Sequence, residues 1–85
     1  MKGISAKIDR RGVSLIVQTQ DVPGTSSYIE TLVYDSGRLL YSQKISTLSL
    51  RQSTDWPNRL NKLIADAHKS VLSDIAAGRL DRFLP

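Results

Sequence analysis

One apolar stripe constrains the fold of this chain more than any other feature. Between Asp55 and Ala77, apolar side chains recur every three or four residues, which places them along one side of an α-helix. They are Trp56, Leu60, Leu63, Ile64, Ala67, Val71 and Ile75. Residue types that cap helices stand before the stripe, and Gly78 is a natural stop after it. Such a helix must bury its stripe on another element, which the preceding residues are expected to form.

The first part of the chain alternates between apolar and polar residues, as half-buried strands do. The alternating apolar residues are Ile4, Ala6, Ile8, Val13, Leu15 and Val17. They predict a hairpin of strands at about 4–8 and 13–20 with a four-residue loop, which sets Ile8 opposite Val13. All six then share one face, and Ile16 points to the other.

A second hairpin is predicted from strands at about 28–35 and 38–46, and two registers are open. A three-residue loop with a left-handed Gly37 groups Ile29, Val33, Leu39, Tyr41 and Ile45 on one face. A two-residue turn of Ser36 and Gly37 groups Tyr28, Leu32, Tyr34, Leu39, Tyr41 and Ile45. We favour the three-residue loop, because serine disfavours a positive φ.

These segments predict an α+β fold in one domain, residues 1–85. The expected order is an antiparallel meander of three to four strands, at about 4–8, 13–20, 28–35 and 38–46, and then one C-terminal helix, at about 55–77, packed on one sheet face. A chain of 85 residues buries only about 60–65% of its unfolded surface. Without cysteine it forms no disulfide, so self-association is the simplest remaining way to bury more surface.

Composition narrows the functional classes. The sequence has no apolar run of membrane-spanning length and a polar N-terminus, which predicts a soluble cytoplasmic protein with no membrane partner. Its net charge of +4 is typical of proteins that bind nucleic acid, but acidic residues stand beside the basic ones along the chain. We therefore take solubility as the main role of the charge and do not favour a nucleic-acid partner.

No constellation of catalytic residues stands out in the sequence. His68 is the only histidine, and Asp66 and Asp74 leave the helix in other directions, so we expect His68 to cover the edge of the helix–sheet interface. Glu30 is the only glutamate, and it is expected to face solvent from mid-strand, opposite Ser42 or Gln43. We predict no catalytic residue, no cofactor and no metal site, and hence no enzyme.

The predicted topology brings arginines to one end of the molecule. In a four-strand meander the first and third turns share an end, and the helix runs back towards it. The arginines placed there are Arg10, Arg11, Arg38, Arg79 and Arg82. They suggest contacts to an anion or a nucleic-acid backbone. The competing interpretation, which we prefer, is a balanced surface, because Asp9, Asp35, Asp74 and Asp81 share that end.

A single helix leaves one sheet face uncovered. The residues expected to face a partner there are Ile16, Tyr28, Leu32, Tyr34 and Leu40, and the register of the second hairpin decides how apolar that face is. We therefore expect a non-enzymatic protein-interaction or regulatory module that binds a protein partner or forms a homodimer. The alternative is a nucleic-acid-binding module that uses the arginine end and the open sheet face.

Three stretches resemble a small bacterial domain family that has no assigned activity. They are VQTQD at 17–21, IETLVYDSGRLLYSQK at 29–44 and ADAHKSVLSDIAAGRLD at 65–81. The family has a VQTED-like strand end, a hairpin with a Gly-Arg-hydrophobic motif, and a helix containing Gln-His-Lys. This chain departs from it at Gln20 and Ala67. The resemblance implies strands before a helix and a bacterial source, and no catalytic role.

Overall fold

The computed structural model describes residues 3–85, so the first two residues of the predicted domain lie outside it. Four antiparallel strands precede one long helix, and the predicted α+β class is confirmed. The elements are β1 (Gly3–Arg10), β2 (Val13–Val22), β3 (Tyr28–Asp35), β4 (Arg38–Ser46), a 3₁₀ turn η1 (Leu50–Gln52), α1 (Trp56–Ala76) and a 3₁₀ turn η2 (Asp81–Phe83).

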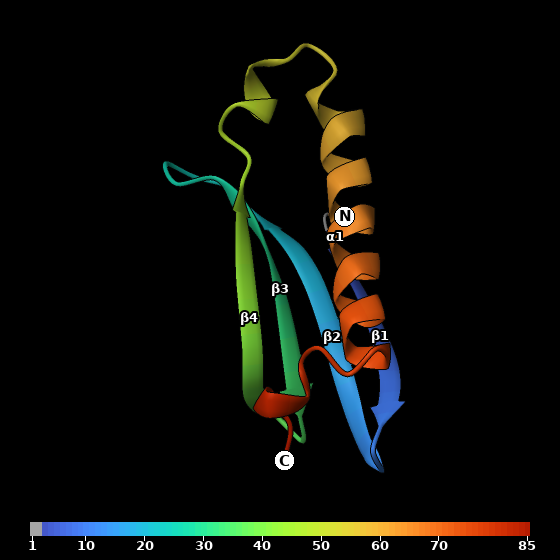
Figure 1. Ribbon diagram of the computed structural model, residues 1–85. Helices are drawn as coiled ribbons and strands as arrows, with labels where there is room; N and C mark the ends of the chain where they lie inside the picture. Colours follow the sequence, from blue (N-terminus) through green and yellow to red (C-terminus); the bar gives the residue numbers. More distant parts are fainter. Residues whose placement is uncertain (1–2) are drawn as a thin grey trace.

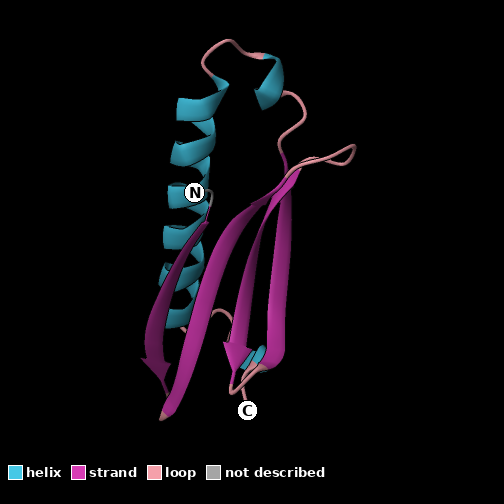
Figure 2. Cartoon of the chain, turned by 180° about the vertical axis from the view of Figure 1, so that it is seen from behind, coloured by secondary structure: helices cyan, strands magenta, loops and turns pink. Residues whose placement is uncertain are grey.

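The strands form one sheet in the order β1-β2-β3-β4, and α1 lies along one of its faces (Figure 1). The molecule is elongated, with extents of 44 × 21 × 21 Å. The helix packs mostly on β2 and β1 and less on β3, while β4 lies furthest from it. The opposite face, seen in Figure 2, has no helix over it. We call this opposite face the bare face.

The first hairpin turns more tightly than the sequence suggested. Arg10 pairs with Val13, so the connection has two residues, and Arg11 (φ 55°) and Gly12 (φ 80°) both take the left-handed conformation of a type I′ turn. The predicted four-residue loop, with Ile8 opposite Val13, is wrong by two residues, because Ile8 pairs with Leu15. A shift of two leaves every side chain on its predicted face.

The second hairpin combines features of both registers. Its turn has two residues, with Ser36 at φ 50° and Gly37 at φ 83°, so the expected three-residue loop is wrong. A β-bulge follows, because Tyr34 pairs with Leu39 whereas Val33 pairs with Tyr41. The extra residue in β4 reverses the alternation beyond the turn. Ile29, Val33, Tyr41 and Ile45 therefore share the helix-side face, as the three-residue register required.

The interior consists of two apolar clusters along the length of α1. The first contains Leu15, Val17, Val33, Val71, Ile75 and Leu80, and the second contains Ile29, Leu60, Ile64 and Ala67. The stripe residues of α1 named here are buried, as the helical spacing predicted. Phe83 and Leu84 pack against the first cluster, so the C-terminal tail folds back onto the core.

The end of α1 is closed by backbone hydrogen bonds. Gly78 (φ 81°) donates its N–H to the carbonyl of Ile75, and Arg79 donates its N–H to the carbonyl of Asp74. This is a Schellman motif, for which glycine is the favoured residue at the left-handed position. The predicted stop at Gly78 is confirmed.

An ion pair holds the connection between the sheet and α1. Arg51 Nη2 donates to Asp21 Oδ1 at 2.6 Å, and both side chains are largely buried. The Arg51 guanidinium also lies 4.9 Å from the centre of the Trp56 ring. These contacts attach η1 to the end of β2.

Candidate protein-binding face

An apolar patch crosses three strands on the bare face. Ile16 pairs with Tyr34, and Tyr34 pairs with Leu39, so these side chains lie side by side across β2, β3 and β4. Leu32 lies one step further along β3 on the same face. Ile16 is 40% exposed and Leu39 is 50% exposed, while Tyr34 and Leu32 are half-buried. We call these four residues the apolar patch.

The structure places four of the five predicted partner-facing residues on the bare face. Ile16, Leu32 and Tyr34 belong to the apolar patch. Tyr28 is the first residue of β3, and the Lys44 ammonium lies 5.0 Å from the centre of its ring. The prediction for Leu40 is wrong, because the bulge turns it towards the first apolar cluster. Its place is taken by Leu39, and the sequence alone carried no signal for that bulge.

The charged residues around the patch balance one another. Among residues 3–85, strand alternation puts Lys7, Asp9, Glu30 and Lys44 on the bare face, two bases and two acids. Gln20 Nε2 donates to Glu30 Oε1 at 2.7 Å, and Lys44 is the residue opposite Glu30, so the predicted pairing with Ser42 or Gln43 is wrong. The bare face is therefore near neutral although the chain is basic.

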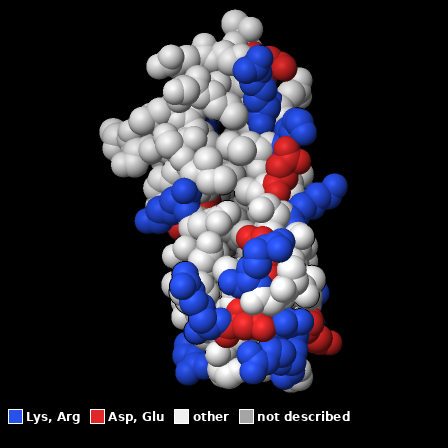
Figure 3. All heavy atoms as spheres, viewed as in Figure 1, with Lys and Arg blue, Asp and Glu red and all other residues white. Residues whose placement is uncertain are grey.

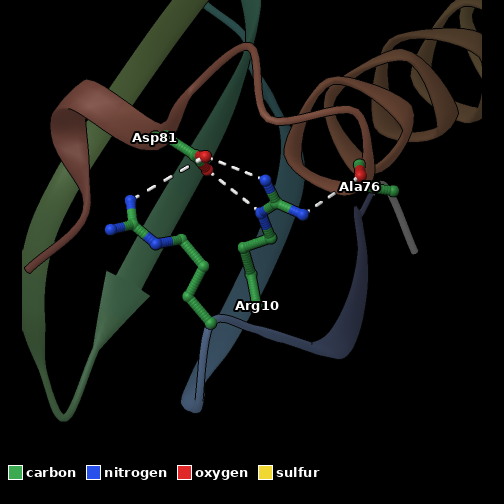
Figure 4. A network of polar contacts seen from close by, with 4 residues as sticks. Arg10, Ala76 and Asp81 are labelled. Carbon is green, nitrogen blue, oxygen red and sulfur yellow. Dashed lines mark hydrogen bonds and ion pairs between the residues drawn. The ribbon is translucent and has the colours of Figure 1, made fainter.

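Arg10 fastens the C-terminal tail to the first hairpin (Figure 4). Its Nε and Nη2 atoms donate to the two carboxylate oxygens of Asp81 at 3.0 and 2.8 Å, and its Nη1 lies 3.5 Å from the carbonyl of Ala76 at the end of α1. The paired hydrogen bonds from Arg10 lower the pKa of Asp81, and those bonds raise the pKa of Arg10. The stabilisation from the pair is therefore present above pH 3.8 and is lost as the pH falls through the lowered pKa.

The remaining predicted arginines also lie near this end, because Arg11 and Arg38 are in or beside the two hairpin turns and the others follow α1. Figure 3 shows basic groups gathered around a few acidic ones at this end. Arg11 is 3.8 Å from Asp81, and Arg79 Nε donates to Asp74 at 2.7 Å. Within residues 3–85, Arg38 and Arg82 form no ion pair, and Arg82 lies 4.9 Å from the Phe83 ring centre. Three of the five arginines thus contact carboxylates.

A buried polar group links α1 to the sheet. His68 Nδ1 lies 2.9 Å from Thr19 Oγ1, which is 2.9 Å from Thr31 Oγ1. All three side chains are buried, so His68 lies inside the interface and the prediction that it covers the edge is wrong. Sequence reasoning missed both threonines, although each continues the inward alternation of its strand, after Val17 and Ile29.

Within residues 3–85, no three His, Asp or Glu side chains gather as candidate metal ligands. No helix in that same range is both long enough and apolar enough to span a membrane.

Comparisons with known proteins add no relative to this picture. No protein-family model matches the chain, and no curated protein or solved structure matches it either. The resemblance to a small bacterial domain family therefore stays a prediction.

Proposed function

We propose that this chain is a non-enzymatic protein-interaction module that binds a second copy of itself through the bare face of its sheet. The observation that carries the proposal is the apolar patch, whose Ile16 and Leu39 are among the most exposed large apolar residues of the chain. Contiguous exposed apolar patches on small domains mark interaction sites. The cysteine-free composition and the resemblance support placing this module in a bacterial cytoplasm.

The charge distribution favours a second copy as the partner. The chain carries a net charge of +4, so two copies repel each other over most approaches. The bare face is the exception, because its two bases are matched by two acids. Self-association there avoids a like-charge penalty and adds buried surface to a chain with a small core.

The strand register suits a two-fold arrangement. Ile16 and Tyr34 are cross-strand neighbours in β2 and β3. A two-fold axis that runs along the strands between them places Ile16 of each copy over Tyr34 of the other. Symmetric interfaces of this kind use one patch that is complementary to itself, and buried aromatic residues supply much of their binding energy.

The proposal predicts a concentration-dependent dimer that Leu39→Glu weakens. Each glutamate at this position must be desolvated in the interface, so we expect at least a tenfold rise in the dimer Kd, equivalent to about 1.4 kcal/mol. Sedimentation equilibrium or light scattering measures it. The matched control is Leu48→Glu, because Leu48 is also 50% exposed but lies outside the sheet. A strict monomer at all concentrations, or equal effects of both variants, contradicts the proposal.

The second candidate function is nucleic-acid binding at the arginine end. Arg38 and Arg82, which form no ion pair with the described residues, favour it. If this function holds, replacing both with alanine lowers the affinity for a single-stranded RNA more than replacing Arg59 and Lys62 on α1 does. Fluorescence anisotropy at about 50 and 200 mM salt measures the effect and its salt slope. Equal losses in the two double variants identify nonspecific attraction and reject a dedicated site.

A further inference from the structure

A polar layer divides the interior of this protein into two parts. Thr19 of β2 pairs with Thr31 of β3. This pair lies between the Val17–Val33 pair and the pair that contains Ile29. His68 completes the layer from α1, and one apolar cluster lies on each side of it. Polar groups buried at such a position need all of their hydrogen bonds, because water cannot replace a missing partner.

The two hydroxyl protons in this layer can be placed in three orders, and only the first of them uses both protons. In the first, Thr31 donates to Thr19, and Thr19 donates to Nδ1 of His68, so both protons are used. In the second, Nδ1–H donates to Thr19, and Thr19 donates to Thr31. The Thr31 proton then has no acceptor, because Thr19 Oγ1 is the only hydrogen-bond partner of the Thr31 side chain within residues 3–85. In the third, Thr31 and Nδ1–H both donate to Thr19, and the Thr19 proton has no acceptor. An unsatisfied buried donor is costly, so a neutral imidazole takes the first order.

We propose that Thr31, Thr19 and His68 form a directional hydrogen-bond chain that holds His68 in its neutral Nε2–H form and makes the docking of α1 on the sheet sensitive to acid. A proton added at Nδ1 reverses both hydrogen bonds. It leaves the Thr31 hydroxyl without an acceptor and places a charge in the interface. Protonation therefore favours separation of α1 from β2 and β3.

The neighbouring charges do not compensate for an imidazolium. Asp21 lies on the same face of β2, two residues beyond Thr19, but it is paired with Arg51 of η1 at 2.6 Å. Thr19 pairs with Ile4 of β1, and Thr31 pairs with Gln43 of β4. Neither of these neighbours is ionisable.

On α1 itself the adjacent charged groups are Asp66 and Lys69, both exposed, and Asp66 accepts a hydrogen bond from Lys62. Burial accordingly lowers the pKa of His68 from its ordinary value of 6.5. The folded state thus binds fewer protons than the unfolded state just below that pH. The contribution of neutral His68 to the free energy of unfolding is complete above about pH 6.5 and decreases as the pH falls towards the lowered pKa.

The test is an NMR titration of the one histidine in the chain, with ¹H–¹⁵N correlations that identify the protonated ring nitrogen. We expect the Nε2–H tautomer in the wild type. Thr31→Val should leave the His68 pKa below its ordinary value of 6.5, because protonation of Nδ1 then orphans the Thr19 hydroxyl in place of the Thr31 hydroxyl. The matched control is Thr47→Val, which removes a buried hydroxyl that is not part of this hydrogen-bond chain and should leave the His68 pKa unchanged.

Either of two results overturns the proposal: an Nδ1–H tautomer in the wild type, or a wild-type His68 pKa at or above its ordinary value of 6.5. If Thr31→Val does not fold, the wild-type tautomer still decides. Urea unfolding at pH 7.5 and 5.5 gives the second measurement. The wild type should lose stability between these pH values, and His68→Gln should lose less, since glutamine does not titrate.

Discussion

Replacing Ile75 with alanine is expected to lower the free energy of unfolding by about 2–5 kcal/mol. Ile75 is completely buried in the first apolar cluster, between α1 and the sheet. Removing three of its carbon atoms leaves a cavity that the β-strands cannot close. Because domains of this size have total stabilities of about 5–15 kcal/mol, the loss is a large fraction of the whole. Urea denaturation followed by circular dichroism measures it.

A neighbouring surface position provides the control for Ile75. Ser73→Ala changes an exposed residue of the same helix and should alter stability by no more than about 0.5 kcal/mol. If Ile75→Ala is too unstable to analyse, Ile75→Val removes one methylene group and should cost about 0.5–1.5 kcal/mol. An Ile75→Ala variant as stable as Ser73→Ala would contradict the position of α1 on the sheet.

Gly78→Ala is expected to destabilise the protein through two separate effects. The residue has φ 81°, and a left-handed conformation costs a non-glycine residue about 1 kcal/mol. In addition, the new Cβ would lie 2.7 Å from Nη2 of Arg10 and 3.2 Å from Oδ2 of Asp81. The guanidinium must shift, which weakens its paired contact with Asp81. Thermal unfolding of the variant measures the sum.

The first hairpin contains a control that separates these two effects. Gly12 has nearly the same φ, 80°, but a Cβ there meets no atom within 4 Å. Gly12→Ala therefore reports the backbone cost alone. The difference between the two variants measures the displacement of Arg10, and combining Gly78→Ala with Asp81→Ala should remove most of that difference. Equal destabilisation by both glycine variants would show that the Arg10–Asp81 contact adds nothing.

The fold class was predictable because buried positions recur with the period of each helix or strand, and apolar residues mark those positions in the sequence. The stripe on α1 and the alternation in β1 and β2 both placed the correct side chains inwards. The turns were harder, since their lengths depend on small differences in backbone energy. Arg11 and Ser36 take positive φ values that side chains usually avoid, and the twist of the paired strands favours the resulting type I′ turns.

The candidate site was less predictable than the fold, for a similar reason. A single extra residue in β4 exchanges Leu39 and Leu40 between the two faces, and no local pattern marks a bulge. The arginines were placed at the correct end by topology alone. Their partners were not predicted, because the contact between Arg10 and Asp81 depends on the path of a tail that follows the helix.

That contact also has a consequence for the order in which the protein folds. Arg10 and Asp81 are 71 residues apart, so bringing them together carries one of the largest loop-closure costs in the molecule. The hairpins have two-residue turns and can pair early, whereas the first hairpin receives its helical cover only from the far end of the sequence. During synthesis, β1 to β4 therefore expose an open apolar face until α1 has emerged, and the Arg10–Asp81 contact forms only after that. This interval is when the chain is most vulnerable to aggregation and most in need of a chaperone.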